Sequence, residues 1–166
     1  MPHESVFDEL KARLRGKVAI LAVGNRYRAD DGAGPRLIDL LSERIPPEKR
    51  ELLIDGGEKP ENYLELLKEL QPDSLLIVDA AEFNGRGGEL RVIGKGEIDE
   101  FTLSTHTLPL SLLIQLIEME VGFTPVLLGI RPENLDFSEV LSSSVSETLN
   151  AIAEFLIPFF NSSRQP

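Results

Sequence analysis

The sequence contains no cysteine and no tryptophan, and it has only two histidines. Without cysteine, disulfides, thiolate metal sites and a cysteine nucleophile are all excluded. Basic residues are also scarce, since 17 lysines and arginines stand against 28 aspartates and glutamates, a net charge of -11. This charge argues against nucleic acid or an anionic membrane as a partner, because phosphates would be repelled rather than neutralised.

Long apolar runs and targeting signals are missing as well. No apolar stretch approaches the roughly 20 residues that a membrane helix needs, so no membrane insertion is expected. The amino-terminal segment, with Glu4, Asp8 and Glu9, lacks the basic-then-apolar layout of a signal peptide. These absences predict a cytoplasmic protein.

What the sequence does contain is an alternation of apolar runs and amphipathic segments. Short continuous apolar runs predict buried strands, and apolar residues at helical spacing predict helices. The predicted strands are residues 17–23, 51–54, 74–78 and 124–130, with a shorter, half-polar strand at 89–93. The predicted helices are residues 4–15, 35–45, 60–70, 109–120 and 144–159.

This alternation predicts the α/β class, as a three-layer sandwich with a mostly parallel, doubly wound sheet and helices on both faces. A chain of 166 residues suits one domain, so residues 1–166 are expected to form a single unit. Residues 1–16 precede the first strand as an extension that we expect to be helical. Residues 161–166 should fray.

Acidic residues follow three of the predicted strands. Asp30 and Asp31 come just past the first strand, Asp55 past the second and Asp79 past the third. In an open doubly wound sheet, ligands bind beyond the carboxyl ends of the strands, where the strand order reverses. With the order 2-1-3, Asp31 and Asp79 flank one crevice, and such crowding of like charge needs water or a cation to offset it. Together with His106, these two aspartates are candidates for a metal site.

Each of these residues also has a purely structural interpretation. Asp55 precedes two glycines, and an aspartate before glycine commonly belongs to a turn. Asp30 fits the N-cap of a helix that begins near Gly32. Asp79 ends a buried strand without a glycine turn and is less easily explained in this way. A lone loop histidine such as His106 is commonly a surface or hydrogen-bonding residue, so the residues alone leave both interpretations open.

Two other kinds of site are weaker alternatives. The glycine-rich segment GNRYRADDGAG (residues 24–34) follows the first strand as in a nucleotide-binding fold, but it lacks the G-x-G-x-x-G spacing. Its two aspartates would also repel a pyrophosphate from the helix terminus. Ser104 and Thr105, beside His106, suggest a hydroxyl nucleophile, but no G-x-S-x-G elbow accompanies them.

Four segments carry a more specific pattern. VGNRYRADDGAGPRL joins a glycine–asparagine turn to an acidic pair and a glycine, and IDGGEKPEN, LLIVDAAEFNGRGGELRVI and STHTLPLSLLIQLIE follow along the chain. In this order and spacing, from about Val18 to Pro132, they resemble the signatures of the [NiFe] hydrogenase maturation protease family. The ENYL and HTLPL details resemble its formate-hydrogenlyase branch. The extension before the first strand departs from the family pattern and is expected to serve packing or association.

The resemblance implies an activity and a site. It implies an endopeptidase that removes the C-terminal extension of a [NiFe] hydrogenase large-subunit precursor after nickel insertion. The family's metal site maps onto Asp31, Asp79 and His106, which are therefore expected to be both metal ligands and catalytic residues. Asp55 matches a further aspartate near that site. Two carboxylates and an imidazole suit nickel among other divalent ions, and we expect the precursor to supply the nickel.

Three questions stay open at this point. Nickel could polarise the scissile carbonyl or activate water, or an aspartate could act as a general base without metal catalysis. The alternative function is a non-proteolytic nickel-binding chaperone or sensor on the same scaffold, which would use the same three residues. A nucleotide-binding module is a third possibility. The expected partner is the precursor alone, with the protein itself a monomer.

Overall fold

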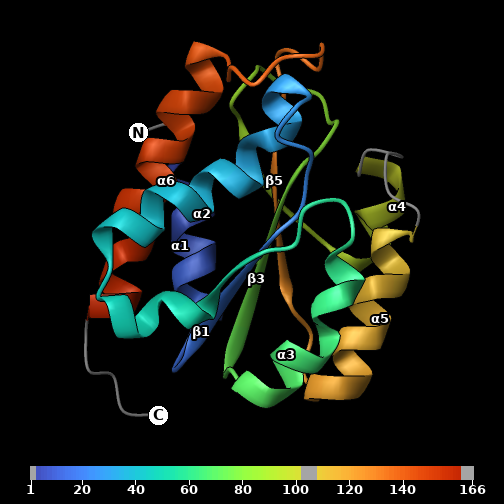
Figure 1. Ribbon diagram of the computed structural model, residues 1–166. Coiled ribbons are helices and arrows are strands. Elements are labelled where there is room, and N and C mark those ends of the chain that lie inside the picture. Colours follow the sequence, from blue (N-terminus) through green and yellow to red (C-terminus); the bar gives the residue numbers. More distant parts are fainter. Residues whose placement is uncertain (1–2, 102–107, 162–166) are drawn as a thin grey trace.

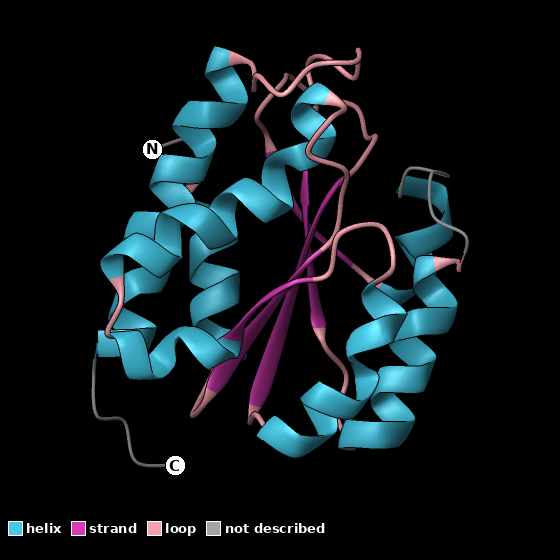
Figure 2. Ribbon diagram, in the orientation of Figure 1, coloured by secondary structure: helices cyan, strands magenta, loops and turns pink. Residues whose placement is uncertain are grey.

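A computed structural model describes residues 3–101 and 108–161. Within these residues five strands form one sheet in the order β2-β1-β3-β5-β4, with helices on both faces (Figures 1 and 2). Four strands run parallel, and β4 pairs with β5 in the antiparallel sense at one edge. The strands are β1 (Val18–Ala22), β2 (Leu53–Asp55), β3 (Ser74–Ala80), β4 (Leu90–Ile93) and β5 (Val126–Ile130). The predicted three-layer architecture with a mostly parallel sheet is confirmed.

Helices make up the two outer layers of the sandwich. One layer holds α1 (Glu4–Arg13), α2 (Ala33–Arg44) and α6 (Ser143–Asn161), and the other holds α3 (Leu64–Leu70), α4 (Ile98–Phe101) and α5 (Leu110–Val121) (Figure 1). The short 3-10 helices are η1 (Ala29–Gly32), η2 (Pro47–Leu52), η3 (Pro60–Tyr63) and η4 (Lys95–Glu97). No helix within the described ranges has both the length and the apolar character needed to cross a membrane.

The central strands are apolar throughout because both of their faces are covered. Every residue of β1, β3 and β5 is buried. An alternating pattern would place polar side chains against one helical layer, so a continuous apolar run is the sequence that fits this position. One cluster of buried hydrophobic residues extends from Leu10 in α1 to Phe160 in α6.

The amino-terminal extension is part of this core. Leu10 and Leu14 are 0% and 2% exposed. The ring of Phe7 stacks on that of Phe155 in α6, with centroids 4.7 Å apart and planes inclined by 7°. The extension therefore has a packing role within the chain itself.

The second strand differs from its predicted position. It was expected at residues 51–54 but comprises Leu53–Asp55, because Pro47–Leu52 form the 3-10 helix η2. Pro47 occupies the first turn of this helix, where its fixed φ is tolerated, and the N–H of Lys49 donates to the carbonyl of Pro46 at 2.9 Å. The β3 strand is longer than expected and includes Asp79, and the short elements η4 and α4 were not predicted.

Candidate functional site

The carboxyl ends of β1 and β3 lie side by side in the sheet. Their parallel register pairs Ala22 with Val78, and the N–H of Val23 donates to the carbonyl of Val78 at 2.9 Å. Because β2 lies on the far side of β1, the strand order reverses between β1 and β3, as the order 2-1-3 requires. A doubly wound sheet opens a crevice at this point, and it is the usual place for a ligand.

Asp31 lies at this edge, in η1 between β1 and α2. Its side chain is buried, with 1% of the residue exposed, and its Oδ2 accepts the backbone N–H of Asn25 at 3.0 Å. Helix α2 begins two residues later, so Asp31 lies beside the partial positive charge of its N-terminus. The turn depends on Gly24, whose φ of +144° is rare for other residues and whose Cβ would collide with the carbonyl oxygen of Asp31.

Asp79 is the next-to-last residue of β3 and is 0% exposed. Its Oδ1 accepts the backbone N–H of Ala80 at 2.8 Å, and in the sheet it pairs with Gly129 of β5. Burial of a carboxylate is costly unless hydrogen bonds, an opposite charge or a metal ion compensates for it. Two buried aspartates at one switch point therefore form a setting that a divalent cation would stabilise.

The third residue of the predicted site, His106, lies outside the described residues, as do Ser104 and Thr105. Within residues 3–101 and 108–161, no group of three His, Cys, Asp or Glu side chains could hold a metal ion. The structure thus brings Asp31 and Asp79 to the same edge of the sheet. The complete site of Asp31, Asp79 and His106 stays a prediction.

Asp30 has a different role from its neighbour Asp31. It is 1% exposed, and its carboxylate accepts the backbone N–H groups of Glu133, Asn134 and Ser142 at 2.8, 2.9 and 2.8 Å. It also accepts the hydroxyl of Ser142 at 2.7 Å. Asp30 therefore fastens the loop that follows β5 to the loop that follows β1.

The interpretation of Asp30 as a helix N-cap is wrong in its detail. Helix α2 begins at Ala33 with Gly32 at the N-cap, and no side chain caps it. The partners of Asp30 lie 103 to 112 residues further along the chain. No local sequence pattern could have identified them, because the contact exists only once β5 has joined the sheet.

Asp55 combines a turn with an ion pair. Its Oδ1 accepts the backbone N–H of Gly57 at 3.1 Å, which confirms the turn interpretation. Its Oδ2 accepts from Arg26 at 2.8 Å. The same guanidinium holds Asp39 through two hydrogen bonds of 2.6 and 3.0 Å, and these bonds are the main reason why the pKa of Arg26 is raised. The charge of Asp55 is thus compensated by an ion pair within the protein.

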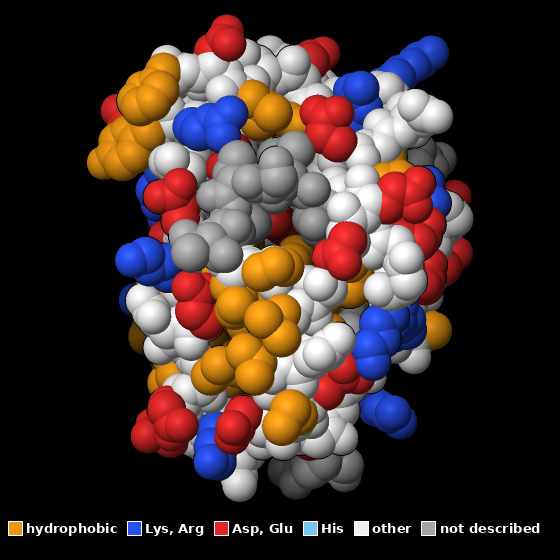
Figure 3. Space-filling view, turned by 90° about the vertical axis from the view of Figure 1, so that its right-hand side faces the viewer, with side chains coloured by type: hydrophobic (Ala, Val, Ile, Leu, Met, Phe, Trp, Pro, Cys, Tyr) orange, Lys and Arg blue, Asp and Glu red, His pale blue; other side chains and the backbone are white. Residues whose placement is uncertain are grey.

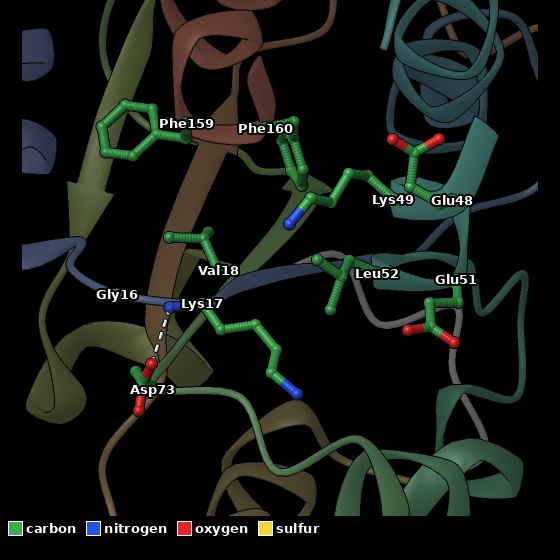
Figure 4. A pocket seen from close by; sticks show the side chains of 10 residues that line it. All are labelled: Gly16, Lys17, Val18, Glu48, Lys49, Glu51, Leu52, Asp73, Phe159 and Phe160. Carbon is green, nitrogen blue, oxygen red and sulfur yellow. Dashed lines mark hydrogen bonds between the residues drawn. The ribbon is translucent and has the colours of Figure 1, made fainter. Parts of the chain in front are cut away.

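The structure has cavities at both edges of the sheet, and one of about 270 Å³ at the carboxyl edge is lined by Gly24, Asn25 and Asp55. A cavity of about 360 Å³ lies at the opposite, amino edge of the sheet, between the start of β1, η2 and the end of α6 (Figure 4). Charges of both signs line it, from Lys17, Lys49, Glu48, Glu51 and Asp73. The face formed by α3 and α5 instead carries a strip of hydrophobic side chains (Figure 3). Neither feature combines burial with an excess of one charge.

Comparison with known proteins gives consistent results. The HycI model of the hydrogenase maturation proteases matches residues 35–158. The hydrogenase 3 maturation protease of Escherichia coli K12 is 36% identical over 140 residues, which cover 82% of this chain and 86% of the relative.

Solved structures agree with this result. The endopeptidase HycI from Escherichia coli superimposes with a TM-score of 0.72 at 33% identity, over 84% of this chain and 88% of that one. The [NiFe] hydrogenase maturation protease HycI from Thermococcus kodakarensis gives a TM-score of 0.75 at 28% identity, over 92% of this chain and 98% of that one. The chain belongs to the hydrogenase maturation protease family.

Proposed function

We propose that this protein is the endopeptidase that removes the C-terminal extension of a [NiFe] hydrogenase large-subunit precursor after nickel insertion. Membership of the family supports the class of reaction, and the Escherichia coli relative, a hydrogenase 3 maturation protease, supports a substrate of this kind. The substrate is then a protein that already holds its nickel, and the protease has no resident metal of its own.

The observation that carries the proposal is the burial of Asp31 and Asp79 at the point where the strand order reverses. Two carboxylates buried at one edge of the sheet would attract a divalent cation and would release it readily, because much of its coordination sphere is left open. We propose His106 as a third ligand, on the motif STHTLPL that it shares with the family.

In this scheme the nickel in the precursor is recognised by Asp31, Asp79 and His106, and the attached peptide is placed over the crevice. The metal can polarise the scissile carbonyl or lower the pKa of an attacking water. An aspartate that takes a proton from this water as a general base is the competing arrangement. In either case the two carboxylates must be ionised when the precursor binds.

The deciding experiment uses purified precursor in a nickel-loaded and a nickel-free form. We expect the loaded precursor to lose its C-terminal extension, detected by intact-protein mass spectrometry, while the nickel-free form stays uncut. Binding of the loaded precursor without any change in mass would instead support the chaperone or sensor function. Efficient cutting of nickel-free precursor, or of an unrelated protein such as casein, would replace the proposal with a general protease.

A further inference from the structure

Three large hydrophobic side chains are exposed in the two loops at the carboxyl edge of the sheet. Tyr27, in the loop after β1, is 59% exposed, and Phe137 and Val140, in the loop after β5, are 89% and 72% exposed. We call these three residues the apolar rim. Large apolar side chains that are exposed together on a protein surface commonly mark an interaction site, because covering them is energetically favourable.

The two loops of the apolar rim are joined by backbone hydrogen bonds. The N–H of Ala29 donates to the carbonyl of Ser138 at 2.7 Å, and the N–H of Ser138 donates to the carbonyl of Tyr27 at 2.9 Å. These bonds form an isolated parallel bridge between Arg28 and Ser138. Tyr27 and Phe137 are therefore set beside each other by the backbone, although 110 positions separate them in the sequence.

Asp30 then connects the apolar rim to the candidate site. Its carboxylate accepts backbone N–H groups of Glu133, Asn134 and Ser142 in the loop after β5. The next residue in the chain is Asp31. The five-residue segment 27–31 thus contains Tyr27 of the apolar rim, Asp30, which binds the loop after β5, and Asp31 of the candidate site. An ordered apolar surface loses little conformational entropy when a partner covers it, so this arrangement is prepared for binding.

We propose that the apolar rim docks the folded body of the large-subunit precursor and so places the peptide to be cut over Asp31 and Asp79. The inference rests on the proposed function, which makes a protein the substrate. It also follows from position, because a folded partner that presents a peptide to this crevice must cover the loops that border it. The loop after β5 carries Glu133, Asp136 and Glu139, so the complementary surface is an apolar patch bordered by basic side chains.

The other exposed hydrophobic residues are set differently. Leu66 and Leu112 are 36% and 40% exposed on α3 and α5, whose packing is bridged by the ion pair of Lys68 with Glu120 at 3.2 Å. Met119 is 80% exposed near the end of α5, which leads into the amino end of β5. Met119 therefore lies toward the opposite edge of the sheet and provides a matched control.

The experiment compares steady-state cleavage of the nickel-loaded, full-length precursor by the wild type, by the triple variant Tyr27→Ser, Phe137→Ser, Val140→Ser, and by Phe137→Ser alone. Docking energy that is equal in the ground and transition states appears in KM and leaves kcat unchanged. We expect KM to rise by about 10- to 100-fold in the triple variant and less in the single one, as for anchor residues of protein interfaces. The variant Met119→Ser should match the wild type within about twofold, since a lone exposed side chain contributes little.

Each other outcome has a definite meaning. If the wild type fails to cut, the proposed function fails, whatever the rim does. If the wild type cuts and the triple variant has an unchanged KM, the docking inference alone is wrong. A lowered kcat with an unchanged KM would mean that these residues shape the site and do not dock the substrate. Sedimentation that shows a dimer in the wild type and monomers in the triple variant, with KM unchanged, would assign the rim to self-association and overturn the inference.

Discussion

The two edges of the sheet both carry acidic residues, but in opposite electrostatic settings. At the amino edge Asp73 is exposed and accepts the backbone N–H of Lys17 at 2.7 Å, in a cavity that two lysines also line (Figure 4). At the carboxyl edge Asp31, in η1 after β1, and Asp79, in the adjacent strand β3, are 1% and 0% exposed. The acids of the first edge are exposed beside two lysines, whereas the two aspartates of the second edge are buried.

The two edges differ in burial and charge more than in the size of their cavities. The amino-edge cavity has a volume of about 360 Å³, and its lining combines two lysines with three exposed acidic residues. Solvent screens exposed charges, so their interactions with one another contribute little free energy. Buried carboxylates near a cleft are instead characteristic of functional sites, and the carboxyl edge has two of them.

The largest effect is expected from Asp79→Asn and Asp31→Asn. Each substitution keeps the shape of the side chain but removes the charge that attracts the cation, so cleavage of the loaded precursor should fall by about 10²- to 10⁴-fold. The melting temperature should change little, or rise slightly if repulsion between the carboxylates is relieved. Mass spectrometry of the product and thermal unfolding measure the two quantities. Near-normal cleavage by both variants would show that the carboxyl edge is not the reactive one.

The next largest effect is expected from His106→Ala. If His106 engages the substrate's nickel, its loss should weaken both docking and cleavage of the loaded precursor by at least about tenfold. Binding of the nickel-free precursor should be poor in the wild type and should not change further. Titration calorimetry with both forms of the precursor tests this prediction. An equal loss of affinity for both forms would contradict a role at the metal.

A moderate effect on stability is expected from Asp30→Ala. This substitution removes four hydrogen bonds that a buried carboxylate accepts, so the free energy of unfolding should decrease by about 2–4 kcal/mol. Urea unfolding measures the decrease, with Asp31→Asn as the matched control that should lose much less. A stable Asp30→Ala variant would mean that the loop after β5 is held in place by other contacts.

The smallest effect is expected at the amino edge. Lys49→Ala changes a side chain that lines the cavity of Figure 4, and it should alter cleavage by less than about twofold and stability by less than about 0.5 kcal/mol. The same assays apply. A strong loss of cleavage in this variant would contradict the comparison, because it would place a substrate contact at the amino edge.

The sequence predicted the structure best where the pattern within a single strand or helix determines the element. Apolar runs identified β1, β3 and β5 because strands buried on both faces admit few polar residues. The β2 strand was predicted less accurately, since its flanking residues 47–52 form a 3-10 helix that a short apolar pattern does not reveal. Asp31 and Asp79 could be placed at one edge because the carboxyl ends of parallel strands share it.

The sequence alone could not distinguish the roles of adjacent residues of the same type. Asp30 and Asp31 are both aspartates and are equally buried, yet one fastens a distant loop and the other borders the crevice. The apolar rim is likewise divided between residue 27 and residues 137–140. Local patterns determined the class of fold, the strand ends that carry the acids and the family. Only the tertiary structure decided which aspartate faces which partner, because those hydrogen bonds join segments more than 100 residues apart, which meet only when the sheet has formed.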